Sequence, residues 1–134
     1  MTIIVCVDEQ GGILFNHRRV SSDRSVVSDI VKYADHTNLY MSEYSAKLFP
    51  TAANVIVIPN LLNSADSGMI FIEEYCPDAV LDKADRVVIY HFNRRYPSDV
   101  KFPVDIVKKR GTMESSVEFK GNSHDRITRE VYVL

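Results

Sequence analysis

Residues 68–92 of this chain read GMIFIEEYCPDAVLDKADRVVIYHF. The largely apolar runs at 68–72 and 85–92 are typical of buried strands. The residues between them, at 76–81, have room for no more than a marginal helix. A chain in which apolar runs alternate with helical segments is typical of an α/β protein. We therefore predict an α/β domain whose sheet contains both runs.

Further strands are expected on both sides of this stretch. Residues 2–7 (TIIVCV) form an unbroken run of mostly β-branched residues, which is typical of a strand buried on both faces. Residues 127–133 alternate between apolar and polar side chains, which also predicts a strand. Shorter runs complete the predicted strands, at residues 38–41, 54–58 and 104–108.

Two helices are predicted between these strands. Ser21, Ser22 and Asp23 are of the types that cap helix N-termini, and apolar residues then recur at helical spacing, so a helix is expected over residues 22–34. A second helix is expected from Ser42 to just before Pro50, because proline cannot continue a helix. Residues 59–65 have the pattern of one helical turn.

The composition sets the class of protein. The chain has 134 residues, 46% hydrophobic and 25% charged, which fits a single domain over residues 1–134 and excludes a mainly disordered chain. The apolar runs are too short to cross a bilayer and the N-terminus lacks a basic signal segment, so we expect a cytoplasmic protein with no membrane partner. A net charge of -2 provides no global field for binding nucleic acid.

The cysteines and histidines form no recognisable site motif. Cys6 and Cys76 are expected to be reduced structural thiols, and the four histidines lack metal-ligand spacing, so no metal is predicted. Ser123, His124 and Asp125 are adjacent in the sequence, whereas catalytic triads are assembled from distant segments. We expect these three to be turn residues.

The order of the segments resembles that of the dihydrofolate reductase family along nearly the whole chain. The similarity is carried by residues 3–13 (IIVCVDEQGGI), 29–33 (DIVKY), 68–72, 84–92, 99–103 (DVKFP) and 130–132 (EVY). The resemblance implies a central, mainly parallel sheet with an antiparallel C-terminal hairpin and flanking helices. It also implies that folate and NADPH bind across the carboxyl ends of the strands, which is the general ligand position in open α/β sheets.

A reductase of that family uses an acid that holds the pterin and assists protonation of its ring. Two residues of this chain compete for the role. Asp29 is followed by the expected residue types, while Asp23 lies nearer to the loop that the acid should follow. Both also have structural explanations, Asp23 as an acid at a helix start and Asp29 as a residue on a solvated helix face.

Other parts of the family's machinery are replaced. Residues 19–21 (RVS) stand in place of Leu-Pro-Trp, residues 41–45 (MSEYS) lack the Gly-Arg-x-Thr signature, and Glu73 and Glu74 replace the cofactor diglycine. Two carboxylates repel a pyrophosphate instead of receiving it. The segment around 76–81 is also short for the family's cofactor-binding helix. We therefore predict a divergent, shortened member that has no cofactor, with NADPH disfavoured.

Three functional hypotheses follow. The first is a non-catalytic protein that binds a small anionic or nucleotide-like ligand in the remnant cleft, because guanidinium groups suit phosphate and carboxylate. Its predicted ligand-binding residues are Asn16, Arg18, Arg19, Asp29, Tyr40, Ser42 and Tyr44. The second is a divergent NADPH-dependent reductase of a pterin-like substrate, with Asp29 or Asp23 as its acid. The third is an interaction module whose C-terminal strand or basic hairpin docks a protein partner, or a second copy in a homodimer, by strand pairing.

Overall fold

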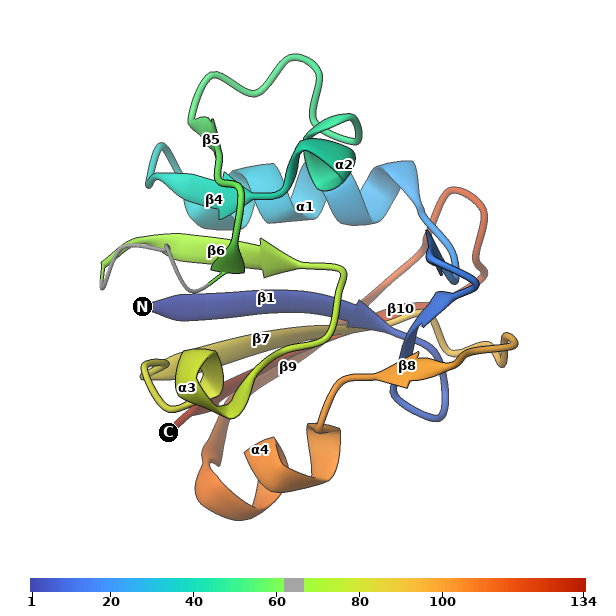
Figure 1. The fold of residues 1–134 in the computed structure, drawn as a ribbon. Coiled ribbons are helices and arrows are strands. Elements are labelled where there is room, and N and C mark those ends of the chain that lie inside the picture. Colours follow the sequence, from blue (N-terminus) through green and yellow to red (C-terminus); the bar gives the residue numbers. More distant parts are fainter. Residues whose placement is uncertain (62–66) are drawn as a thin grey trace.

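A seven-stranded sheet runs through the molecule in the computed structural model, which describes residues 1–61 and 67–134 (Figure 1). The strands lie in the order β5-β4-β6-β1-β7-β10-β9. Their bounds are β1 Thr2–Val7, β4 Leu39–Met41, β5 Val55–Val57, β6 Met69–Ile72, β7 Arg86–His91, β9 Thr112–Phe119 and β10 Ile127–Val133. The first five in spatial order are parallel, whereas β10 is antiparallel to both β7 and β9. The predicted fold class, α/β with a mainly parallel sheet and an antiparallel C-terminal hairpin, is confirmed.

A small second sheet lies beside the carboxyl end of β1. Strand β2 (Gly12–Phe15) lies between β3 (Arg18–Arg19) and β8 (Val100–Lys101). Asn16 and His17 join β2 to β3 with φ angles of 52° and 65°, which is the two-residue turn that suits a twisted hairpin. Asp99 Oδ2 accepts the N–H of Asn16 at 3.0 Å and holds this turn. Sequence reasoning misses these strands because they are too short to show a period.

Helix α1 (Arg24–Ala34) begins where the capping residues predict it. The Asp23 side chain accepts the N–H of Ser25, and the helix ends at Asp35 in the left-handed conformation. Helix α2 (Glu43–Ala46) also starts close to the predicted position, with Ser42 as its N-cap, although it ends earlier than expected. Helix α3 (Asp78–Leu81) lies inside the segment predicted as a marginal helix. The helical turn predicted at 59–65 falls largely on residues 62–66, which lie outside the described residues.

One predicted strand is wrong. Residues 104–108 belong to helix α4 (Val104–Arg110). Pro103 precedes this helix, Asp105 lies in its first turn, and its last turn is basic, so the charges complement the helix dipole. Only Val107 of this helix is buried, which explains why its apolar residues gave a misleading strand pattern. Strand β9 is missed for a related reason, because its residues are exposed or half-buried and Ser115 interrupts the apolar alternation of Met113, Val117 and Phe119.

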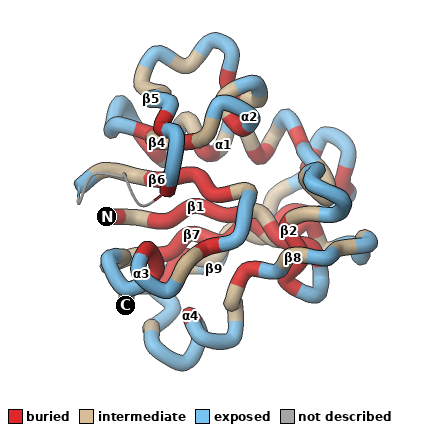
Figure 2. The backbone as a smooth tube through the Cα atoms, in the orientation of Figure 1, coloured by how far each residue is buried: buried red, intermediate tan, exposed pale blue. Residues whose placement is uncertain are grey.

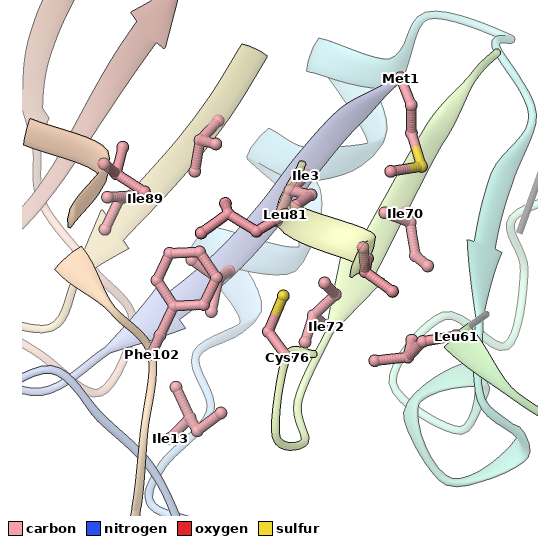
Figure 3. Packing of buried hydrophobic residues seen from close by; sticks show 14 of the residues in the cluster. Met1, Ile3, Ile13, Leu61, Ile70, Ile72, Cys76, Leu81, Ile89 and Phe102 are labelled. Carbon is pink, nitrogen blue, oxygen red and sulfur yellow. The ribbon is translucent and has the colours of Figure 1, made fainter. Parts of the chain in front are cut away.

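Alternate residues of the central strands point into two separate cores. Figure 2 shows that buried residues run along β1 and β7. One core contains Ile3, Ile89 and Leu81 and is covered by α3 and α4 (Figure 3). The other contains Ile4 and Val88 and is covered by α1. Because both faces of these strands are buried, their sequences are continuously apolar.

Truncation of a central core residue tests this arrangement. Ile89 is fully buried in β7, so Ile89→Ala removes apolar contacts and leaves a cavity. We expect it to lower the free energy of unfolding by about 2 to 5 kcal/mol. Ile106 on α4 is 40% exposed, and Ile106→Ala is the matched control, with an expected change within about 0.5 kcal/mol. Urea unfolding measures both, and equal effects of the two substitutions contradict the described core.

Candidate functional site

The candidate site lies at the carboxyl ends of β1 and β6. These strands are neighbours, but the helices that follow them lie on opposite faces of the sheet. Helix α1 covers the face of Ile4, and α3 covers the face of Ile3. Ligands of open α/β sheets bind in the crevice that such a divergence creates.

An arginine–glutamate pair occupies this crevice. Glu73 directly follows β6, and Arg19 reaches it from β3. Arg19 Nε donates to Glu73 Oε2 at 2.8 Å and Arg19 Nη2 donates to Oε1 at 3.1 Å, so the contact is bidentate. Only 21% of the Arg19 side chain and 10% of the Glu73 side chain is exposed. Burial by itself lowers the pKa of Arg19, but the hydrogen bond and charge of Glu73 raise it, so Arg19 stays cationic.

Helix α2 surrounds the pair with hydroxyl groups. Tyr44 OH accepts the backbone N–H of Arg19 at 3.1 Å, and the Tyr44 ring centre lies 4.2 Å from the Arg19 guanidinium carbon. Ser45 Oγ donates to Glu73 Oε1 at 2.8 Å, while Ser42 Oγ accepts the N–H of Ser45. The structure thus brings together Arg19, Ser42 and Tyr44 from the predicted set. It adds Ser45, to which sequence reasoning gave no role, and Glu73, which was expected only to repel a pyrophosphate.

Little space remains inside the crevice. The cavity there has a volume of about 10 Å³, close to what one water molecule needs. Cys6 and Phe71 line it from the sheet, and Val26 and Ile30 line it from α1. Burial raises the pKa of the Cys6 thiol, so Cys6 is a neutral part of this wall. A ligand larger than water therefore requires the hairpin of β2 and β3, or α2, to move.

Asp23, one of the two candidate acids, is held by structural hydrogen bonds. Its side chain is fully buried. Oδ1 accepts the N–H groups of Ser25 and Asn122 at 2.8 and 2.9 Å, and Oδ2 accepts that of Ser123 at 2.9 Å. Burial by itself raises the pKa of Asp23, but these donors and the His124 imidazole outweigh it and hold the pKa well below its usual range. Asp23 therefore carries no proton at neutral pH.

The imidazole of His124 completes this anchor. Its Nδ1 lies 2.9 Å from Asp23 Oδ2, and its Nε2 lies 2.7 Å from Tyr96 OH and 3.1 Å from Ser21 Oγ. An acid, an imidazole and a hydroxyl in this order resemble a catalytic triad. However, Tyr96 contacts the same nitrogen as Ser21, and the side chains of His124 and Asp23 are only 2% and 0% exposed. We interpret the group as a buried network that ties the loop before β10 to the start of α1.

Asp29, the other candidate acid, lies in a separate cluster. Tyr90 OH donates to Asp29 Oδ2 at 2.6 Å, and Arg129 Nη1 donates to the same oxygen at 2.7 Å. Burial, and then the negative charge of Asp29, raises the pKa of Tyr90, so its hydroxyl remains a donor. The cluster joins α1 to β7 and β10. Among the described residues, no hydrogen bond or ion pair joins this cluster to Arg19 or Glu73.

The remaining predicted ligand-binding residues do not join the site either. Asn16 forms the turn between β2 and β3, and Arg18 follows it; both are exposed. Tyr40 packs against the core that lies beneath α3, close to Gly68. Sequence spacing places these residues near the crevice but does not show which way each side chain points.

The other reactive side chains gather no metal or redox site in the described ranges, 1–61 and 67–134. There, no three His, Cys, Asp or Glu side chains are placed to hold a metal ion. Cys6 and Cys76 are free thiols, and burial raises the pKa of Cys76 to about 11. None of the helices in those ranges is long and apolar enough to cross a membrane.

Comparison with solved structures identifies the fold. The chain is similar to a dihydrofolate reductase from Enterococcus faecalis, solved in complex with NADP(H) and RAB-propyl, with a TM-score of 0.66. The match covers 99% of this chain and 95% of that chain at 13% sequence identity, so it establishes the fold and not the function. No protein-family profile and no curated protein matches the sequence. The chain thus has a dihydrofolate reductase-like fold, as the order of its segments predicts.

Asp23 makes the stability of this fold sensitive to acid. Its pKa is lower in the folded protein than the value of about 3.9 in an unfolded chain. Its contribution is therefore complete above about pH 5 and is lost as the pH falls through about 4 and below. We expect Asp23→Asn to lose about 3 kcal/mol of unfolding free energy at neutral pH. We also expect the variant to lose less stability than the wild type on acidification, as measured by urea unfolding at a series of pH values.

The matched control for this experiment is Asp125→Asn. Asp125 is an exposed carboxylate two residues beyond Ser123 in the same loop, so its removal leaves both the stability and its pH dependence unchanged. A pH profile of Asp23→Asn that runs parallel to the wild-type profile contradicts the assignment of the acid sensitivity to Asp23.

Proposed function

We propose that this protein is a non-catalytic member of the dihydrofolate reductase-like fold that binds a small anionic, nucleotide-like ligand. The binding site is the crevice between β1 and β6. The observation that carries the proposal is the bidentate contact between Arg19 and Glu73. Arg19 supplies a permanent cation at the usual ligand position of an open α/β sheet, and the carboxylate of Glu73 is bound to it.

Glu73 takes the place of the ligand's anionic group in this proposal. A guanidinium binds carboxylate and phosphate through the same pair of N–H groups, so an incoming anion can replace Glu73 on Arg19. Tyr44 and Ser45 supply hydroxyl groups beside that position. Because the exchange breaks the link between β3 and β6, it frees the hairpin to move and the crevice to widen.

The residues present do not fit a bound NADPH. Glu73 and Glu74 follow β6 where that cofactor's pyrophosphate requires glycine and free N–H groups. A like-charge pair at about 4 Å costs roughly 1 kcal/mol in water and more near a protein surface. Asp23 and Asp29, the acids considered for proton transfer, are committed to other groups. These features favour binding over hydride transfer, and they support a divergence and shortening that removed the cofactor site.

The exposed edge of the sheet favours a second candidate function, which is pairing with another strand. Strand β9 ends the sheet, and its Met113 and Val117 side chains are 46% and 41% exposed. An open edge that carries apolar side chains is a template for strand addition. In this candidate, β9 pairs with β9 of a second copy and forms a homodimer.

Calorimetric titration separates binding from reduction. We expect NADPH with dihydrofolate to show no oxidation of the nicotinamide, and at least one mononucleotide to bind. Glu73→Gln removes the competing carboxylate, so we expect it to bind that nucleotide about tenfold more tightly. Arg19→Gln removes the cation and weakens binding by a similar factor.

The control for Glu73→Gln is Glu74→Gln, because Glu74 is an exposed neighbour that does not contact Arg19. It is expected to change affinity by less than about twofold, since exposed charges interact weakly. Micromolar binding and oxidation of NADPH refute the proposal and establish the reductase alternative. A nucleotide that binds equally well to Arg19→Gln also refutes the proposed site.

The dimer candidate has its own test. Lysine on an edge strand opposes strand pairing, so we expect Val117→Lys to remain monomeric at protein concentrations where the wild type dimerises. Light scattering coupled to size exclusion measures the mass. A wild-type chain that stays monomeric at the highest soluble concentration eliminates this candidate.

A further inference from the structure

A second hollow lies outside the crevice, beside strands β2 and β8 of the small sheet. Its volume is about 550 Å³, within the size range of small-molecule sites. Three segments form it: the loop after β1, strand β2, and the chain from residue 95 to β8. The side chains that carry the argument are Gln10, Phe15, Arg95, Tyr96, Ser98 and Lys101.

The charge of this hollow is one-sided. Arg95 and Lys101 both line it, and no carboxylate does. Neither cation forms an ion pair within residues 1–61 and 67–134. Of the nearby acids, Asp8 is buried and accepts backbone N–H groups, and Asp99 accepts the N–H of Asn16. Glu9 and Asp105 line a neighbouring hollow on the other side of Lys101 and do not line this one. Two cations that share a concave surface without a counter-charge attract an anion.

An aromatic ring completes the hollow. The Phe15 side chain is 49% exposed although it belongs to a strand. An exposed aromatic face next to cations is the combination that receives a planar base together with its phosphate, because the base stacks on the ring and the phosphate pairs with the cations. Gln10 and Ser98 supply polar groups in the same hollow.

The two walls of the hollow are fixed by one buried carboxylate. Asp8 Oδ1 accepts the N–H groups of Gln10 and Gly12 at 2.8 and 2.7 Å, and Asp8 Oδ2 accepts that of Tyr96 at 3.0 Å. A Cβ on Gly12 would lie 2.5 Å from Ser98 Oγ, so the walls touch and only glycine fits between them. A site held in this way needs little rearrangement when a ligand binds.

We propose that this hollow binds a nucleoside monophosphate, with the base stacked on Phe15 and the phosphate between Arg95 and Lys101. Phe15 and Arg19 both belong to the hairpin of β2 and β3, but they contribute to different sites. The inference therefore does not depend on the function proposed for the crevice.

The test is an NMR amide-shift titration of the whole chain with AMP, and with adenosine and inorganic phosphate as partial ligands. We expect AMP to shift the amides of Phe15, Arg95 and Lys101 to saturation. Adenosine lacks the phosphate charge and inorganic phosphate lacks the base, so each is expected to bind at least about tenfold more weakly than AMP.

Variants of exposed residues keep the fold intact and locate the ligand. Phe15→Leu, Arg95→Gln and Lys101→Gln are each expected to weaken AMP binding about fivefold. Lys32→Gln on α1 is the matched control for a lost surface cation, and it is expected to leave the affinity at the hollow unchanged.

Two outcomes overturn the proposal. One is the absence of saturable shifts at Phe15, Arg95 and Lys101. The other is an affinity that falls with Arg19→Gln but not with Lys101→Gln, which places AMP in the crevice and supports the function proposed there. Loss of affinity at the hollow alone supports this inference whatever the outcome at the crevice.

Discussion

The carboxylate of Asp23 is fully buried, so it has to take its hydrogen bonds from the protein itself. It takes them from the first turn of α1 and from residues 122–124, about a hundred positions further along the chain. That requirement fixes where α1 begins and where the chain enters β10. A Cβ on Gly121 would lie 2.6 Å from Asp23 Oδ2, so the loop can come this close only with glycine at that point. The carboxyl edge of the sheet is organised around this anchor.

Other carboxylates at the same edge follow the same logic. Asp8 ties together the loops on either side of β2, and Glu73 ties β6 to β3 and α2. Each of these carboxylates accepts hydrogen bonds from donors that would otherwise be available to a bound anion. Because the chain's own carboxylates bind these donors, we favour a site where an anion replaces Glu73 on Arg19 over a site for a pyrophosphate.

The sequence predicts the parts of this structure that bury apolar surface in a regular period. Strands β1, β6 and β7 and helix α1 are found because their core contacts repeat along the chain. Helix α4 and strand β9 are not, because one buries a single residue and the other is mostly exposed. At the site, residue type identified Arg19, but its partner Glu73 is 54 positions away. Side-chain direction separates Asp29 and Tyr40 from that pair, and no local pattern contains this information.

The pairing register of the hairpin of β2 and β3 determines which side chains reach each of the two proposed sites. Leu14 pairs with Arg19 and Phe15 pairs with Arg18, and successive residues of a strand face opposite sides. Arg19 therefore points into the crevice while Phe15 points into the hollow. A shift by one residue would exchange these sides and leave Glu73 without its cation. The turn at Asn16 and His17, held by Asp99, excludes that shift, so a two-residue turn determines which charge and which ring each side of the hairpin presents.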